Sequence, residues 1–132
     1  MARGTHRPER GAAAVEFAIL LPVLVLIIGG IVDFGRAYFT QIVLTNAARE
    51  GTRVAVTKSP VADITTRTQA AAKPVVDSGY PVVVGVTGDC SALTPSATVV
   101  VTATVSNFSY FFLDGFIPGL PHTISSRSQM GC

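Results

Sequence analysis

Charged residues are scarce in this chain, and so are the residue types on which most enzymes and metal sites depend. Only 14% of the 132 residues are charged, and the chain has two histidines, two cysteines and no tryptophan. It contains no glycine-rich phosphate loop and no HExxH, GxSxG or CxxC motif. These absences argue against an enzyme, a metal site, a cofactor or a small-molecule substrate. The net charge of +2 is also too small for a nucleic-acid-binding surface.

What the chain has in excess is apolar residues, which make up 48% of it and give a mean hydropathy of +0.49. They are concentrated at residues 12–32, AAAVEFAILLPVLVLIIGGIV, where the only charge is Glu16. A helix of about 21 residues is about 30 Å long, the thickness of the hydrocarbon layer. A single small domain could not enclose a helix that is apolar on all sides, so a membrane span is favoured over a buried core helix. Proline at position 22 is tolerated in such a span.

The residues before this run predict its orientation. Residues 1–11 carry three arginines against one glutamate, which favours a basic leader kept in the cytoplasm and a chain that continues outside. A cleavable secretory signal, with Gly35-Arg36-Ala37 as its processing site, is the alternative. The apolar run exceeds the roughly 7–15 residues of a signal core, which favours the retained span.

Glu16 needs a partner, because a carboxylate in the middle of a bilayer costs about 2.5–3.5 kcal/mol. It lies near the end of the span, so its side chain could extend to the lipid headgroups. Alternatively, a cut after Gly11 would place the new α-amine of Ala12 one helical turn away. Side-by-side helices could then pair the amine of one subunit with the Glu16 carboxylate of the next, in a low dielectric that strengthens the attraction.

Four segments together resemble the TadE-like family, the minor pilins or pseudopilins of the tight-adherence (Tad, type IVc, Flp-type) pilus. They are RGAAAVEFA at 10–18, LLP at 20–22, DFGRA at 33–37 and TNAAREG at 45–51. The resemblance implies that a prepilin peptidase cuts between Gly11 and Ala12 and that Glu16 is the fifth residue of the mature chain. It also implies other pilin and pseudopilin subunits, the Tad secretion platform and membrane lipid as partners. The bacterial inner membrane is then the expected location, with incorporation into the extracellular pilus.

Beyond the span, residues 33–58 are expected to continue the same helix outside the membrane. Apolar or small residues recur at spacings of three and four, which predicts one buried face. They are Phe34, Tyr38, Ile42, Thr45 and Ala48. This face would rest on the chain's own C-terminal domain or contact neighbouring subunits, and the helix should end near Gly51 or by Pro60.

Residues 59–132 are expected to form a small exported α+β domain. A second helix should start with Ser59 as N-cap and Pro60 in its first turn, and should end near Ala72. Strand character follows at 81–86, 97–106 and 123–130, most clearly as the alternation of valine and threonine in the second segment. The expected fold is therefore type IV pilin-like α+β, with a long N-terminal helix, a second helix and a three-stranded antiparallel sheet.

An aromatic segment, FSYFFLDGFIPG at 108–119, separates the second and third strands. It would either close the small core or form an exposed patch for a partner subunit or the membrane surface.

The two cysteines, Cys90 and Cys132, predict one disulfide in an exported domain. It would close a loop of about 43 residues and stabilise the fold by roughly 4 kcal/mol. Two free thiols, or a bond to another chain, are the alternatives.

The function expected from these features is structural: a minor pilin or pseudopilin that assembles into a Tad pilus used for adhesion. The alternative is an uncleaved, single-pass, membrane-anchored binding module outside the cytoplasm. The two hypotheses differ at Gly11, which is cut in the first and intact in the second.

Overall fold

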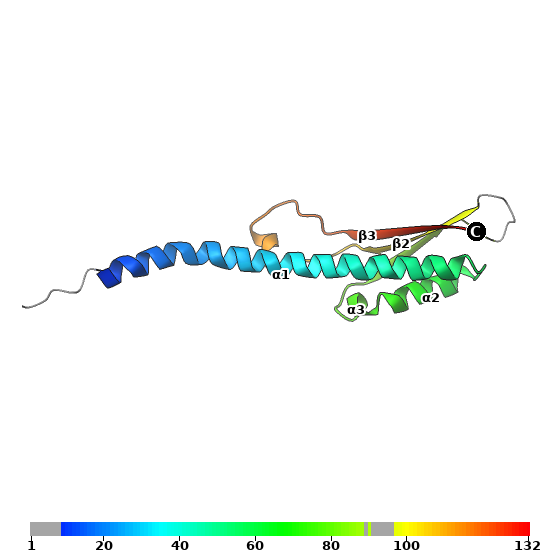
Figure 1. Ribbon diagram of the computed structural model, residues 1–132, viewed down its shortest axis with the longest axis horizontal. Helices are drawn as coiled ribbons and strands as arrows, with labels where there is room; N and C mark the ends of the chain where they lie inside the picture. The colour runs from blue at the N-terminus through cyan, green and yellow to red at the C-terminus, as the bar shows by residue number, and fades with distance from the viewer. Residues whose placement is uncertain (1–8, 89, 91–96) are drawn as a thin grey trace, which may run out of the picture.

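A long N-terminal helix runs through most of the length of the molecule (Figure 1). The computed structural model describes residues 9–88, 90 and 97–132. The elements follow the expected α+β order. They are α1 (Glu9–Ala55), α2 (Val61–Ala71), α3 (Lys73–Val76), β1 (Val82–Thr87), β2 (Thr98–Val105), the short 3-10 helix η1 (Leu113–Gly115) and β3 (Ile124–Gly131). The predicted fold class, with its long helix, second helix and three-stranded antiparallel sheet, is confirmed. Arg3 and Arg7 of the expected leader lie outside the described residues.

The α1 helix has 47 residues, about 70 Å of helix, and ends at Ala55, between the expected limits of Gly51 and Pro60. It begins at Glu9 and not at Ala12, so the expected cleavage position is already helical. Pro22 lies inside it without ending it. Gly51, expected near the helix end, is an interior residue buried against Thr68 of α2 and Val101 of β2. The glycine is needed there because it lets the three elements approach closely.

The sheet has β2 in the centre, with β1 and β3 antiparallel on either side. Val101, for example, lies between Val86 of β1 and Ser128 of β3. Along β2 every second residue is buried, as the alternation predicted, namely Val99, Val101, Ala103 and Val105. Burial also alternates along β1, because the outer face of this edge strand is open to solvent. Each strand lies within about one residue of its expected position, which is ordinary variation at element ends.

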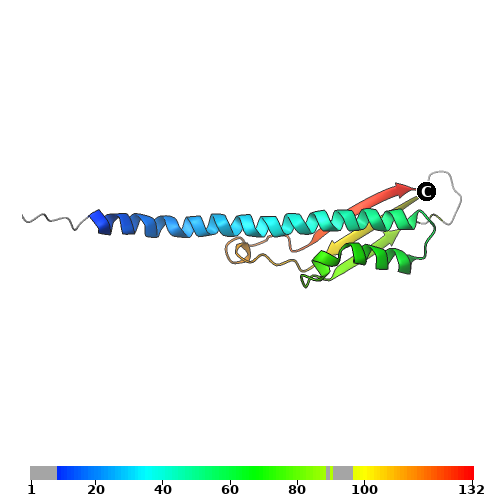
Figure 2. The same cartoon turned by 60° about the horizontal axis from the view of Figure 1, so that its bottom comes forward.

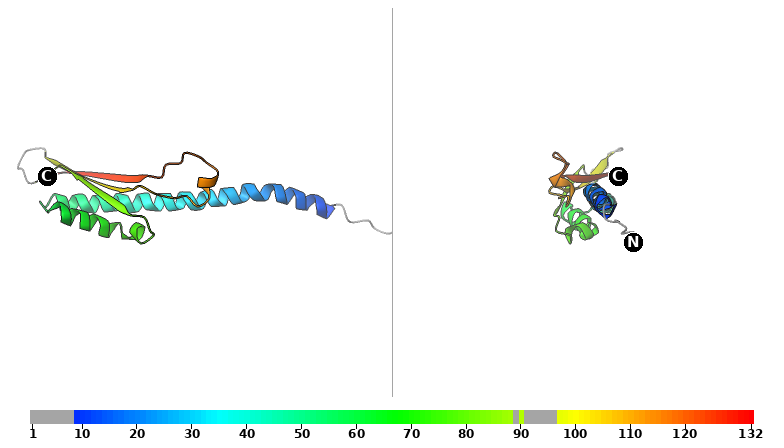
Figure 3. Two further views of the ribbon diagram at one scale, coloured as in Figure 1. Left: turned by 180° about the vertical axis from the view of Figure 1, so that it is seen from behind. Right: turned by 90° about the vertical axis from the view of Figure 1, so that its left-hand side faces the viewer.

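The helices α1 and α2 cover the same face of the sheet, and the C-terminal half of α1 forms part of the core (Figures 2 and 3). The larger core cluster contains Val43, Leu44, Ala47, Ala48, Ala72, Val75, Val82, Ala103, Val105 and Phe108. Residues 33–58 and 59–132 therefore share one hydrophobic core. We call the described residues that follow α1, from Val56 onward, the head.

The buried face of α1 agrees with the predicted one only in part. Ala48 is buried and Thr45 is half-buried, as expected. Phe34, Tyr38 and Ile42 are exposed, and the buried positions are mostly small or polar. Buried on α1 from residue 33 are Asp33, Thr40, Val43, Leu44, Ala47, Ala48, Gly51, Thr52 and Ala55. The pattern was misread because Thr40 and Thr52 look polar. Their hydroxyls donate to carbonyls four residues earlier, which satisfies them within the helix.

The start of α2 also differs from the prediction. Pro60, not Ser59, occupies the N-cap position, with its carbonyl accepting from the N–H groups of Asp63 and Ile64. The Ser59 hydroxyl instead lies 3.0 Å from the hydroxyl of Thr57. Pro74 does not stop the helical path either, because it lies in the first turn of the short α3, where its missing N–H costs no hydrogen bond.

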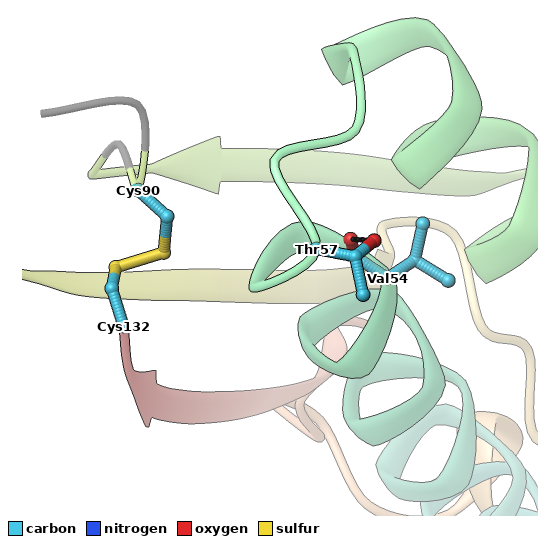
Figure 4. Close-up of a disulfide and its surroundings, with 4 residues drawn as sticks. All are labelled: Val54, Thr57, Cys90 and Cys132. Atoms are coloured by element: carbon cyan, nitrogen blue, oxygen red, sulfur yellow. Dashed lines mark hydrogen bonds between the residues drawn. A yellow bond between two sulfur atoms is a disulfide. The ribbon is translucent and has the colours of Figure 1, made fainter.

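The two cysteines form the disulfide that the sequence predicted (Figure 4). Their Cα atoms are 5.4 Å apart, and the bond joins the chain after β1 to the chain after β3. Cys90 is buried in a second cluster with Ala55 and Val99. The N–H of Cys132 also donates to the carbonyl of Ala97, 2.9 Å away. The disulfide therefore holds the ends of β1, β2 and β3 together at one end of the sheet.

Two glycines of α1 provide a direct test of the close packing. Gly51→Ala should improve helix propensity by about 1 kcal/mol, yet its Cβ would overlap the side chains of Thr68 and Val101. We expect the free energy of unfolding to fall by about 1–3 kcal/mol, measured by thermal or denaturant unfolding in detergent.

Gly35→Ala is the matched control, because no atom lies within 4 Å of a Cβ at that position. It should stabilise the protein by about 0.5–1 kcal/mol. Equal stabilisation by both alanines would contradict the close approach at Gly51.

Candidate functional site

The residues predicted to take part in processing and assembly lie on the N-terminal part of α1, which extends beyond the head (Figure 1). Gly11 is the third residue of α1, Ala12 follows it, and both are exposed. A Cβ on Gly11 would meet no atom within 4 Å. Glu16 is exposed as well, one turn further along. The structure thus presents all three residues on a helix surface that the head leaves uncovered.

The same part of α1 is long and apolar enough to cross a membrane, by length and composition. Its large side chains from Val15 to Leu26 are exposed, and so are Ile27, Ile28, Ile31 and Val32. An apolar helix that its own domain leaves largely uncovered is compatible with a single-pass membrane anchor.

Where the apolar stretch ends, Asp33 joins α1 to the loop before η1. Its buried carboxylate accepts three backbone N–H groups. Oδ1 is 2.8 Å from the nitrogen of Phe111, and Oδ2 is 2.7 and 2.9 Å from those of Phe112 and Leu113. These are charge-assisted hydrogen bonds, about twice as strong as neutral ones. One side chain of α1 therefore fixes the path of a loop about 80 residues further along the chain.

Burial acts to raise the pKa of the Asp33 carboxyl, but the three backbone hydrogen bonds and the charge of Arg36 outweigh it. The pKa therefore lies below its ordinary value of 3.8. All of this keeps Asp33 ionised near neutral pH. Since its oxygens are engaged with backbone N–H groups, the carboxylate is a positioning group and is not free for acid–base chemistry.

Arg36 extends this junction to other parts of the head. Its guanidinium donates to the hydroxyl of Tyr80 at 2.8 Å, lies 3.7 Å from the Asp33 carboxylate, and sits 5.7 Å from the centre of the Phe108 ring. The Tyr80 and Phe108 rings are stacked, with their centroids 5.2 Å apart. Within the DFGRA motif, Asp33 and Arg36 thus bind the head to α1. Sequence reasoning missed this role, although an aspartate directly after an apolar span with an arginine three residues on was the available signal.

One part of the aromatic segment closes the core and another part is exposed, so the segment is divided between the two alternatives. Phe108 is buried in the core, whereas Phe111 and Phe116 are 78% and 67% exposed. Phe112 packs on Gly29, where a Cβ would overlap its ring. Between this loop and α1 lies an open apolar groove with a volume of 310 Å³, lined in part by Leu21, Leu26 and Phe116.

The described part of the chain contains no group of three histidine, cysteine, aspartate or glutamate residues arranged to hold a metal ion. The contacts of Asp33 and Arg36 hold the head on a helix that is compatible with a membrane.

Comparison with known proteins finds a match to the segment that forms most of α1. The family model described as TadE-like protein matches residues 11–53, which confirms the resemblance seen in the sequence motifs. This match suggests a protein associated with the Tad pilus. Residues 54–132 lie outside the matched segment. No curated protein and no solved structure matches the chain.

The Asp33 junction has a testable energetic role. Asp33→Asn would put an amide group against three N–H donors, and we expect the free energy of unfolding at pH 7 to fall by about 3 kcal/mol. Because the folded-state pKa is lowered, the stabilisation by Asp33 is full above pH 3.8 and is lost as pH falls through the folded-state pKa. Unfolding measured between neutral and strongly acidic pH should therefore show a smaller acid loss in the variant than in the natural protein.

Asp63→Asn is a suitable control, because Asp63 is exposed in the first turn of α2. Its replacement should cost no more than about 1 kcal/mol. If Asp33→Asn had an equally small effect and the same acid dependence as the natural protein, the proposed energetic role would be wrong.

Proposed function

We propose that this protein is a minor pilin or pseudopilin, a structural subunit that takes part in the assembly of a Tad pilus used for adhesion, and that it is not an enzyme. The observation that carries the proposal is the uncovered apolar part of α1, which bears Gly11, Ala12 and Glu16 and falls within the TadE-like match. In this role the bacterial inner membrane holds α1, with the N-terminus in the cytoplasm and the head outside. Other pilin and pseudopilin subunits and the Tad secretion platform are the partners, and the subunit can enter the extracellular pilus.

Maturation is the first step of the proposed function. A prepilin peptidase cleaves the bond between Gly11 and Ala12 and removes the basic leader. This bond lies in the first turn of α1, where the N–H groups have no partner within the helix and the backbone is easiest to unwind. The product begins with Ala12, whose new α-amine is close to Glu16 along the helix.

Assembly then brings α1 helices side by side. Within the low dielectric of a membrane or a filament, the Glu16 carboxylate of one subunit pairs with the Ala12 amine of its neighbour. The exposed stripe of Phe34, Tyr38 and Ile42 supports this role, because the three residues follow each other at intervals of four and share one helix face. The opposite face is buried in the head. One face of α1 therefore packs in the core of its own chain, and the opposite face contacts the neighbouring subunits.

The cleavage step predicts a definite mass. Protein extracted from the membrane of cells that make the prepilin peptidase should lack residues 1–11, and its N-terminal sequence should begin at Ala12. Intact-mass spectrometry measures this directly, and peptidase-deficient cells provide the control. A full-length chain in both strains would support the uncleaved, membrane-anchored binding module instead.

The charge pairing predicts a separation between membrane insertion and assembly. Glu16→Gln keeps the size of the side chain but removes the charge, so pili or subunit cross-links should be lost while the protein remains in the membrane. Glu50→Gln, at an α1 position beyond the apolar stretch, is the matched control and should assemble normally. Normal assembly of Glu16→Gln, measured by pilus shearing and immunoblotting, would remove the pairing role.

A further inference from the structure

The loop around η1 does not stay with the rest of the head. It extends along α1 toward the N-terminus and lies beside the apolar stretch (Figures 1 and 2). Phe112 packs on Gly29, and Phe116 lines the groove with Leu21 and Leu26. We call residues 110–117 the aromatic loop.

The height of this loop along α1 follows from helix geometry. Asp33 is the first charged residue after the apolar run, so it marks the outer boundary of the span. Leu26 lies seven residues before it, which corresponds to about 10 Å along the helix axis. If α1 is in a membrane as proposed above, Phe116 lies on the hydrocarbon side of this boundary.

The backbone of the aromatic loop is suited to such a place, because N–H groups without partners are costly away from water. Asp33 accepts the N–H groups of Phe111, Phe112 and Leu113. The Leu113 carbonyl accepts those of Phe116 and Ile117, at 3.0 and 2.9 Å. Five main-chain donors of the loop therefore have partners within the protein and do not need water.

The loop exposes three large apolar side chains and one acid. Phe111, Phe116 and Ile117 are exposed, and nothing in the head covers them. The one ionisable acid of the loop, Asp114, accepts from the Tyr110 N–H at 3.1 Å and lies 3.9 Å from the His122 ring. His122 belongs to the chain leading to β3, so it links the acid to the rest of the head.

We propose that the aromatic loop is a second membrane contact, in which Phe111, Phe116 and Ile117 enter the outer leaflet beside α1 and lipid acyl chains fill the groove. Lipid is the occupant because the groove walls continue the exposed apolar surface of the span, which lipid already surrounds. Phenylalanine is among the residues with which interfacial segments bury themselves at the boundary of headgroups and acyl chains. The head is thereby held against the membrane surface in one orientation. This inference rests on the membrane placement of α1.

The absence of tryptophan from the chain allows a clean experiment. The full-length protein is reconstituted in phosphatidylcholine vesicles as three single-tryptophan variants. Phe116→Trp reports on the aromatic loop, Phe17→Trp on the span and Val83→Trp on the exposed face of β1. Each is tested for quenching by phosphatidylcholine brominated in its acyl chains and by aqueous iodide, over a series of protein-to-lipid ratios.

We expect Phe116→Trp to behave like Phe17→Trp, with strong quenching by brominated lipid and weak quenching by iodide at every ratio. Val83→Trp should show the reverse. If Phe116→Trp follows Val83→Trp while Phe17→Trp is still quenched by lipid, the loop contact is wrong and the membrane anchor stands. Iodide protection of Phe116→Trp without lipid quenching, growing with the protein-to-lipid ratio, would show a second subunit in the groove and also overturn the inference. Failure of lipid to quench Phe17→Trp would overturn the membrane placement itself.

Discussion

The Asp33 carboxylate holds three backbone N–H groups of a loop that is distant in sequence, and the position of the head along α1 depends on these bonds. A buried charge is costly unless it is fully hydrogen-bonded, so the carboxylate can be buried only with the loop beside it. Arg36, one turn later, adds the contact to Tyr80 and partly neutralises the charge. The head therefore has one height and one orientation on the helix.

The two faces of α1 beyond the apolar stretch differ in the size of their side chains. Toward the sheet it presents alanine, glycine and threonine, which allow the backbones to approach closely, as at Gly51. Away from the sheet it presents Phe34, Tyr38 and Ile42, which would hold the sheet at a distance if they faced it. The described residues cover the three-stranded sheet on one face, and a small core of this kind gains from the disulfide that joins its strand ends.

Much of the fold could be predicted from the sequence because the signals are local. The apolar run, the valine–threonine alternation of β2 and the presence of two cysteines each predict a structure without reference to distant residues. The buried face of α1 could not be predicted in this way, since Thr40 and Thr52 are satisfied by their own helix and Gly51 is selected by contacts with α2 and β2. The position of Asp33 directly after the apolar run was a signal for a special role, but its partners could not be predicted, because they are main-chain groups about 80 residues away. Cleavage after Gly11 and the pairing of Glu16 remain predictions, since they depend on other molecules.

The continuity of α1 has a mechanical consequence. No loop separates the apolar stretch from the part buried in the head, so the chain lacks a joint that could absorb a displacement at the membrane surface. A helix advances about 1.5 Å and turns about 100° with each residue. If a neighbouring subunit shifts its contact on α1 by one residue, the head is therefore both displaced along the helix axis and rotated relative to that subunit. The position of the head along the α1 axis and its rotation about that axis therefore change together. Subunits that pack along this helix would be subject to the same constraint.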